Sequence, residues 1–174
     1  MEALLLGDAN VIIDLVHAQA VHLLSEIVRC EIAEILIPEP VLDEVREEIT
    51  EDELLRLGVQ FVSPTIRQRV EIERMNVLSN SLADKTLFVL CRDLPGSCVW
   101  TNDGALRLLC ERSGLPVQRE FGVLIELVRR GIRSPGEILS VARSVESTNR
   151  RLAGIADRVE RVLADFTRGE TDEC

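Results

Sequence analysis

Short apolar runs alternate with amphipathic segments along the first 130 residues of the chain. Each run ends at a proline, a glycine or a polar residue, which is typical of a strand buried on both faces. The runs predict strands at Ala3–Leu6, Glu34–Pro38, Val59–Val62, Cys98–Trp100 and Leu115–Val117.

The segments between these runs repeat their apolar residues at helical spacing. They predict helices over Val11–Leu24 with a break at Ala18-Gln19, and over Pro40–Ile49, Glu51–Gly58, Ile66–Val77, Ser81–Cys91, Ala105–Arg112 and Phe121–Arg130. Strands that alternate with helices pair in parallel through right-handed crossovers. We therefore expect an α/β fold with a doubly wound, mostly parallel sheet of about five short strands flanked by helices.

The last part of the chain has a different pattern. Ser134-Pro135-Gly136-Glu137 has the residues of a helix start, with Ser as N-cap and Glu three residues later. Beyond it the apolar positions follow a heptad stripe: Val145, Leu152, Val159 and Phe166, with Thr148, Ile155 and Val162 between them. We predict one domain at 1–131 and a C-terminal helical extension at 132–174. The stripe either packs on the chain's own domain or forms a homodimer or partner contact through residues 145–166.

Composition limits the class of protein. The 174 residues are 46% hydrophobic, which suffices for a buried core, and no apolar stretch approaches the roughly 20 residues of a membrane span. The five cysteines are odd in number and contain no CxxC pair. This pattern argues against a disulfide framework and against a zinc site, so we expect a protein of the reducing cytoplasm.

The net charge of −10 is unevenly distributed. Residues 1–100 contain 8 Lys and Arg against 18 Asp and Glu, whereas residues 101–174 contain 12 of each kind. Acidic charge usually opposes nonspecific binding of nucleic acid, but bound metal would neutralise part of it.

Four acidic residues stand in positions that make them candidates for a functional site. Asp8 and Asp103 follow the first and fourth predicted strands, at the edge where a doubly wound sheet binds its ligands. Asp84 shares the apolar face of its helix, and Glu44 stands at i+3 from the apolar Val41. For Asp8 and Asp103 the alternative role is an ordinary helix N-cap.

In order and context these pieces resemble the PIN-domain family, and in particular the toxin-type ribonucleases of bacteria and archaea. The matching segments are Leu6-Gly7-Asp8-Ala9-Asn10-Val11-Ile12-Ile13-Asp14-Leu15, Pro40-Val41-Leu42-Asp43-Glu44-Val45, Leu82-Ala83-Asp84 and Thr101-Asn102-Asp103. The likeness continues through Phe121-Gly122-Val123-Leu124 and covers roughly residues 3–131.

The resemblance implies a metal-dependent endoribonuclease that hydrolyses RNA with a Mg²⁺- or Mn²⁺-activated water. Its catalytic and metal-binding residues would be Asp8, Glu44, Asp84 and Asp103, supported by Asn10, Asp14 and Thr101. Asp14 has the alternative of a purely structural hydrogen-bonding role. Many family members are toxins of toxin–antitoxin pairs, so RNA and an antitoxin are the implied partners. The turn after Asp103 lacks the further acid that some members carry, which leaves a second metal position in doubt.

Arg107, Arg112 and Arg119 are candidates for contacts with RNA phosphates, with ordinary surface charge as the alternative. Two other phosphoryl-transfer classes fit less well. A DxD phosphatase would need an acid at Asn10, and a receiver domain would need a late lysine, whereas the single lysine is Lys85. A remaining alternative is a catalytically weak or inactive PIN-like protein that acts as a protein-interaction or regulatory module through its C-terminal helix.

Overall fold

A computed structural model describes residues 3–76 and 81–169 of the chain. Its strands are β1 (Ala3–Gly7), β2 (Ala33–Pro38), β3 (Gln60–Val62), β4 (Ser97–Trp100) and β5 (Val117–Gln118). All of them pair in parallel, in the order β3-β2-β1-β4-β5. The predicted α/β fold with five short parallel strands is confirmed.

Strand β5 begins two residues later than the sequence predicts. The Leu115 amide donates to the carbonyl of Cys110 at 2.9 Å and so closes the preceding helix. Pairing with β4 begins only at Pro116, whose carbonyl accepts a hydrogen bond from Val99 N at 3.0 Å. The apolar run at 115–117 therefore belongs partly to a helix end.

Helices fill the connections between the strands. They are α1 (Ala9–His17), α2 (Leu23–Arg29), α3 (Glu39–Val45), α4 (Glu51–Arg56), α5 (Ile66–Arg74), α6 (Leu82–Asp93), α7 (Gly104–Arg112) and α8 (Glu120–Arg129). The predicted break after α1 is present, and Gln19 there has a φ of 55°. Val77, the predicted end of α5, lies outside the described residues.

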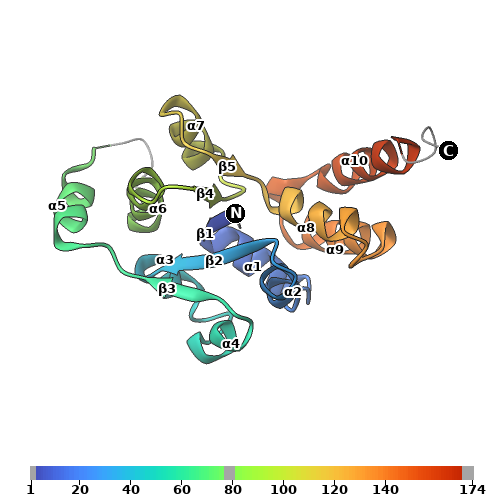
Figure 1. Ribbon diagram of the computed structural model, residues 1–174, viewed down its shortest axis with the longest axis horizontal. Helices are drawn as coiled ribbons and strands as arrows, with labels where there is room; N and C mark the ends of the chain where they lie inside the picture. Colours follow the sequence, from blue (N-terminus) through green and yellow to red (C-terminus); the bar gives the residue numbers. More distant parts are fainter. Residues whose placement is uncertain (1–2, 77–80, 170–174) are drawn as a thin grey trace.

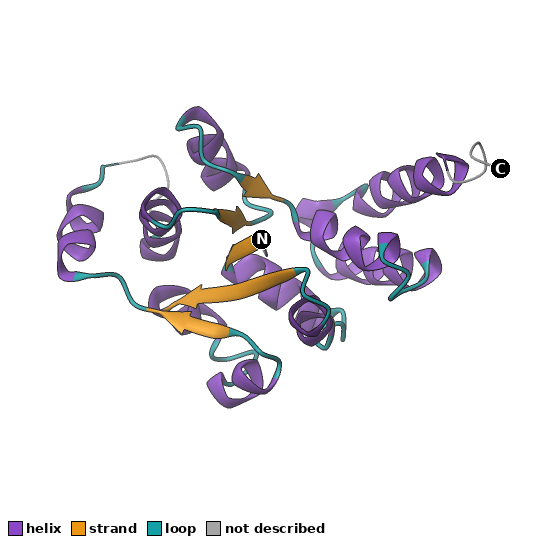
Figure 2. Ribbon diagram, in the orientation of Figure 1, coloured by secondary structure: helices purple, strands orange, loops and turns teal. Residues whose placement is uncertain are grey.

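Two helical layers enclose the sheet. Helix α6 packs on β1, β2 and β4, with α5 beside it, whereas α1, α2 and α8 lie on the opposite side (Figures 1 and 2). The interior between the layers is almost entirely aliphatic, and Trp100 at the end of β4 is its largest buried side chain. Such a core fixes the strand ends, and with them the loops that follow.

The strand order reverses at β1, which has β2 on one side and β4 on the other. In a doubly wound sheet, the crevice outside the carboxyl ends of the strands at such a reversal is where ligands bind. Asp8 follows β1 and Thr101 follows β4, and Asp8 N donates to the carbonyl of Trp100 at 3.0 Å. The fold thus brings two segments 93 residues apart in the chain to one edge.

The C-terminal part forms α9 (Pro135–Thr148), a 3₁₀ turn η1 (Arg150–Leu152) and α10 (Ile155–Gly169). The heptad stripe is therefore broken into two helices rather than one. Val145 and Val159 are buried, because α9 packs on α1 and α8 and α10 packs on α8 and α9. Val162 stays 42% exposed. A homodimer through residues 145–166 remains a prediction.

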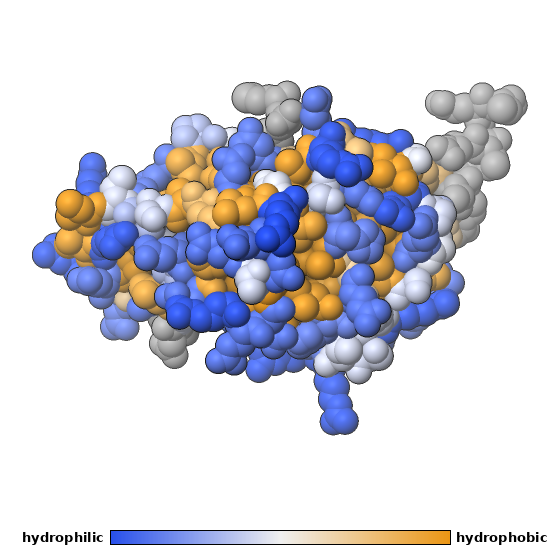
Figure 3. All heavy atoms as spheres, turned by 90° about the horizontal axis from the view of Figure 1, so that it is seen from below, coloured by the Kyte–Doolittle hydropathy of each residue, from blue (hydrophilic) through white to orange (hydrophobic). Residues whose placement is uncertain are grey.

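On the face seen from below in Figure 3, apolar side chains are interspersed among hydrophilic ones. Over the described residues, the helices are too short or too polar to cross a membrane. The cysteines of the described ranges, Cys30, Cys91, Cys98 and Cys110, are all free thiols, as the cysteine pattern predicts.

Candidate metal centre

Asp8 is the most buried acid of the predicted site, with 1% of its surface exposed. It stands at the N-cap position of α1, yet its side chain makes no capping hydrogen bond. The alternative role as an ordinary N-cap therefore does not explain the carboxylate. Its Oδ2 instead accepts a hydrogen bond from Thr101 Oγ1 at 2.5 Å and one from Asn10 Nδ2 at 3.3 Å.

The pKa of Asp8 is raised to about 6, chiefly by burial and to a smaller extent by the nearby negative charges of Asp84 and Asp103. The hydrogen bonds from Thr101 and Asn10 lower the pKa and offset only part of this effect. The charges of Asp84 and Asp103 thus act on Asp8 across the crevice. Desolvated anions that repel one another favour either a proton or a cation.

Thr101 joins the two strand ends. Its hydroxyl is fully buried, donates to Asp8 Oδ2 and accepts a hydrogen bond from the Asp103 amide at 2.9 Å. One side chain therefore sets the position of one acid and the backbone of another.

Asp103 is the N-cap of α7, as the alternative reading of its position predicts. Both cap bonds, from Ala105 N and Leu106 N, end on Oδ1 at 2.8 Å. Such a bond pattern fixes the carboxylate while the second oxygen takes no part in capping. Asp103 can therefore be both a cap and a ligand.

Asp84 and Glu44 approach the crevice from a second direction. Asp84 is in the first turn of α6, whose N-cap is Ser81. Glu44 lies on α3 with an exposed side chain, and its Oε1 accepts a hydrogen bond from Ser81 Oγ at 2.9 Å. Glu44 therefore adjoins the start of α6, but it is not among the charges that act on Asp8.

Within residues 3–76 and 81–169, no three His, Cys, Asp or Glu side chains are already arranged as metal ligands. The donor chemistry nevertheless fits a hard divalent cation, because Asp8, Asp84 and Asp103 supply carboxylate oxygens and Mg²⁺ or Mn²⁺ prefers oxygen ligands. The raised pKa of Asp8 is the observation that supports this fit, since a cation would offset both the burial of the charge and the smaller repulsion from Asp84 and Asp103.

A second pair of buried acidic residues consists of Asp14 and Glu120. The sequence predicts Asp14 as a candidate site residue but not Glu120. Glu120, at the start of α8, is fully buried, and Asp14 on α1 is 4% exposed. Asn102 donates a side-chain hydrogen bond to Glu120 Oε2, and Asn149 donates one to Asp14 Oδ1 at 2.9 Å. Asp14 Oδ2 and Glu120 Oε1 have no partner among the described residues.

The pKa of Glu120 is raised to about 8, chiefly by burial and also by the charge of Asp14, while the hydrogen bond from Asn102 opposes the rise. Burial also raises the pKa of Asp14. A signal for Glu120 exists in the sequence, because it stands at the head of a strongly apolar helix, just as Asp84 does. Asp14 accepts a hydrogen bond from Asn149 in the C-terminal turn, and a supporting role for Asp14 at the metal site stays a prediction.

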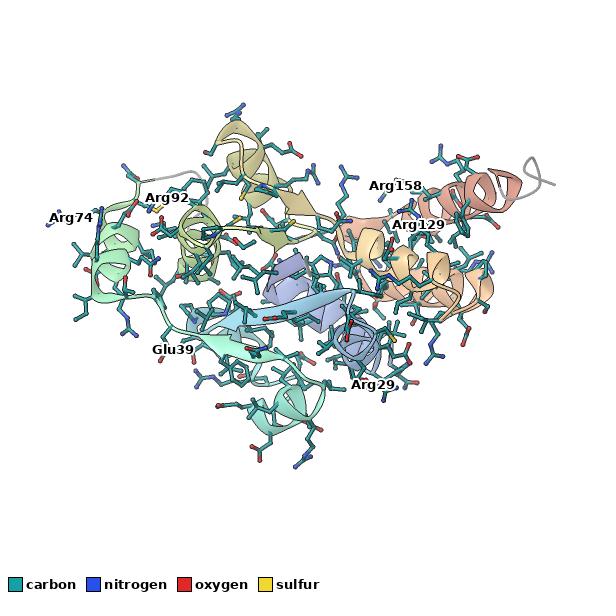
Figure 4. All side chains as sticks on the ribbon, viewed as in Figure 1. Arg29, Glu39, Arg74, Arg92, Arg129 and Arg158 are labelled. Carbon is teal, nitrogen blue, oxygen red and sulfur yellow. The ribbon has the colours of Figure 1, made fainter. Side chains whose placement is uncertain are left out.

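The predicted RNA-contacting arginines are scattered. Arg107 pairs with Glu111 at 3.6 Å, and Arg112 is exposed at the end of α7. Arg119 lines a groove of about 460 Å³ between α8 and α10. Arg129 and Arg158, which are labelled in Figure 4, line the same groove. The three predicted arginines do not line the pocket beside Asp103.

Replacing Thr101 with Val is expected to lower the free energy of unfolding by about 1–3 kcal/mol, because the Asp103 amide and Asp8 lose a buried partner. Urea denaturation monitored by circular dichroism measures this change. Thr86→Val is the matched control, since Thr86 is equally buried but donates only to the helical carbonyl of Leu82. Equal losses in the two variants would contradict the joining role of Thr101.

Comparison with known proteins gives one family. A family model described as a PIN domain matches residues 5–162, from β1 into α10. No curated protein and no solved structure matches the chain. PIN domains are generally nucleases, and they typically use divalent metals. With a match over most of its length and the parallel sheet that carries Asp8 and Asp103 at its switch point, the chain belongs to the PIN-domain family.

Proposed function

We propose that this PIN domain is a metal-dependent endoribonuclease that uses Mg²⁺ or Mn²⁺. The observation that carries the proposal is the buried Asp8 carboxylate, which faces the charges of Asp84 and Asp103 and has its pKa raised to about 6. A carboxyl with a perturbed pKa in a crevice is typical of a functional site. A bound divalent cation would offset the unfavourable burial of the Asp8 charge.

In this proposal Asp8, Asp84 and Asp103 hold the ion, and Glu44 completes the site from α3, next to the start of α6. A bound divalent ion would acidify water and offset the charge that develops on the phosphate. Thr101 and Asn10 orient Asp8 through their hydrogen bonds to Oδ2. The two cap bonds already order the Asp103 carboxylate, so little further ordering of this side chain is needed when the reaction takes place.

The test is cleavage of a labelled single-stranded RNA by the purified protein in Mn²⁺, with EDTA and Asp103→Asn as controls. Cleavage that requires Mn²⁺ and is lost in the variant supports the proposal. Cleavage that persists in EDTA would identify a contaminating metal-independent nuclease, and an inert protein that binds no Mn²⁺ would overturn the proposal.

The toxin role extends this proposal to the cell and is tested separately. Induced expression should slow growth of the host, and Asp8→Ala should restore growth at equal protein levels, because a toxin of this kind acts through RNA cleavage. A growth defect that Asp8→Ala leaves unchanged would contradict the role.

A further inference from the structure

The C-terminal segment contributes a wall to the pocket beside Asp103. This pocket has a volume of about 270 Å³ and is lined by Asn10, Asn102, Asp103, Gly104, Asn149, Arg151 and Leu152. Three of these residues belong to the turn between α9 and α10, nearly fifty residues beyond Asp103 in the chain. The volume is close to the lower limit of about 300 Å³ for small-molecule sites, so it suits a single nucleotide unit.

Asn149 holds this turn against the body of the domain. Its Nδ2 donates to the buried Asp14 Oδ1 at 2.9 Å, and its Oδ1 accepts a hydrogen bond from Arg151 N at 3.1 Å. One amide therefore fixes the turn that carries Arg151 to a buried residue of α1. The contact also gives the buried Asp14 a hydrogen-bond donor, and a carboxylate acceptor makes this bond stronger than one between neutral groups.

Arg151 is the one cationic side chain that lines the pocket. Its side chain is exposed, and within the described part of the chain its guanidinium has neither an ion pair nor a side-chain hydrogen bond. The amide nitrogens of Asn10, Asn102 and Asn149 already donate to Asp8, Glu120 and Asp14. A ligand in the pocket would therefore take its charged hydrogen bonds from Arg151.

The charge around the pocket indicates what that ligand is. An RNA strand that approaches Asp8, Asp84 and Asp103 meets three carboxylates, and residues 1–100 as a whole carry a net charge of −10. A phosphate next to the one being cleaved needs a cation that is not the metal. A guanidinium satisfies this need, because it binds phosphate oxygens with two parallel hydrogen bonds.

We propose that Arg151 binds an RNA phosphate adjacent to the cleaved bond, in the pocket beside Asp103, and that Asn149 and Asp14 are positioning residues for it. This inference rests on the proposed ribonuclease function, and it makes the C-terminal turn part of the substrate site. It also assigns to the turn at 149–152 a role that the heptad stripe does not predict.

The test is binding of a fluorescein-labelled single-stranded RNA, followed by anisotropy with Ca²⁺ in place of Mn²⁺. Arg151→Ala is expected to weaken binding about tenfold, since a charged hydrogen bond to phosphate is lost. It should also reduce the slope of log Kd against log salt by about 0.7, the value for one phosphate contact on a single strand. Arg151→Lys should restore the slope and part of the affinity.

Arg150→Ala is the matched control, because Arg150 is the exposed neighbour and does not line the pocket. It should leave affinity within about twofold of the wild-type value. In cleavage assays Arg151→Ala should raise KM and leave Mn²⁺ affinity unchanged. Asn149→Ala should weaken RNA binding in the same direction, because the turn is no longer held to Asp14.

Equal effects of Arg150→Ala and Arg151→Ala, or a salt slope that Arg151→Ala leaves unchanged, would overturn the inference while metal-dependent cleavage by the wild-type protein stands. An Arg151→Ala variant that binds RNA as tightly as a cleaving wild-type protein would do the same. A wild-type protein with neither cleavage nor Mn²⁺ binding would instead remove the proposed function itself.

Discussion

Asp8→Asn is expected to reduce Mn²⁺-dependent RNA cleavage by about 10³-fold, the usual order for removing a group that acts on the reacting charge. The Asp8 carboxylate is buried between two strand ends, so an amide in its place keeps the shape and removes the charge. Initial rates on a labelled RNA at saturating Mn²⁺ measure the change.

The same substitution should stabilise the metal-free protein, which separates a functional residue from a structural one. A carboxyl group whose pKa is higher in the folded state than in the unfolded state stabilises the fold when protonated. This contribution is complete below the unfolded value of 3.8 and is lost as pH rises through about 6. At about pH 7.5 Asp8 is therefore unfavourable without metal, and Asp8→Asn should raise Tm in EDTA by a few degrees, about 2–4 °C for each kcal/mol.

Asp52→Asn is the control, because Asp52 is an exposed acid on α4. It should leave both the cleavage rate and Tm near their wild-type values. An Asp8→Asn protein that retains full cleavage, or that unfolds more readily in EDTA, would contradict the proposed role of Asp8.

Glu120→Gln is expected to flatten the pH dependence of stability between about pH 4.5 and pH 8. The pKa of Glu120 rises from 4.5 to about 8 on folding, because the carboxyl is buried beside Asp14. Its protonated form is the one that the fold accommodates, so the wild-type protein loses stability as pH rises through this window. The neutral Gln side chain does not titrate and escapes this loss.

The stabilisation should be largest at about pH 8, where Tm should rise by several degrees on the scale of about 2–4 °C for each kcal/mol. Thermal unfolding across the pH range measures the effect. Glu126→Gln on the same helix is the control and should not stabilise, because Glu126 pairs with Arg129 and Arg130 at the surface. A Glu120→Gln profile parallel to that of the wild-type protein would show that Glu120 does not titrate in this window.

The local signals in the sequence were sufficient for the sheet. In β1 the successive residues Leu5 and Leu6 are both buried, and in β2 Ile35 and Ile37 are buried, so a run of apolar residues and its polar end locate a strand. The edge strand β5 begins later than predicted because the Leu115 amide donates to the Cys110 carbonyl at the end of α7 instead of pairing in the sheet. A pattern of apolar residues does not show which carbonyl a backbone amide will bond.

The candidate site was predictable where a residue's role depends on its own strand or helix. Asp8 and Asp103 stand at strand ends, and the topology alone places strand ends together. The contacts of Asp14 and Glu120 could not be predicted in this way. Asp14 meets Asn149 across 135 residues, and Glu120 meets Asn102 across 18.

The heptad stripe shows the same limit. Seven-residue spacing continues through Leu152, but Asn149 has non-helical backbone angles and caps the turn that follows, and Gly154 has a φ of 77°. The helix therefore ends at Asn149, which bonds Asp14, and a new helix begins after Gly154, although the seven-residue spacing of apolar positions continues.

Calorimetric titration of Mn²⁺ into the metal-free protein tests the central claim most directly, because it measures the metal site without requiring the correct RNA. Wild-type protein should bind Mn²⁺ saturably, Asp103→Asn should weaken binding by about tenfold or more, and Asp52→Asn should leave it unchanged. Absence of saturable binding up to about 10 mM Mn²⁺, or an Asp103→Asn protein that binds as tightly as the wild type, would contradict a metal centre formed by Asp8, Asp84 and Asp103.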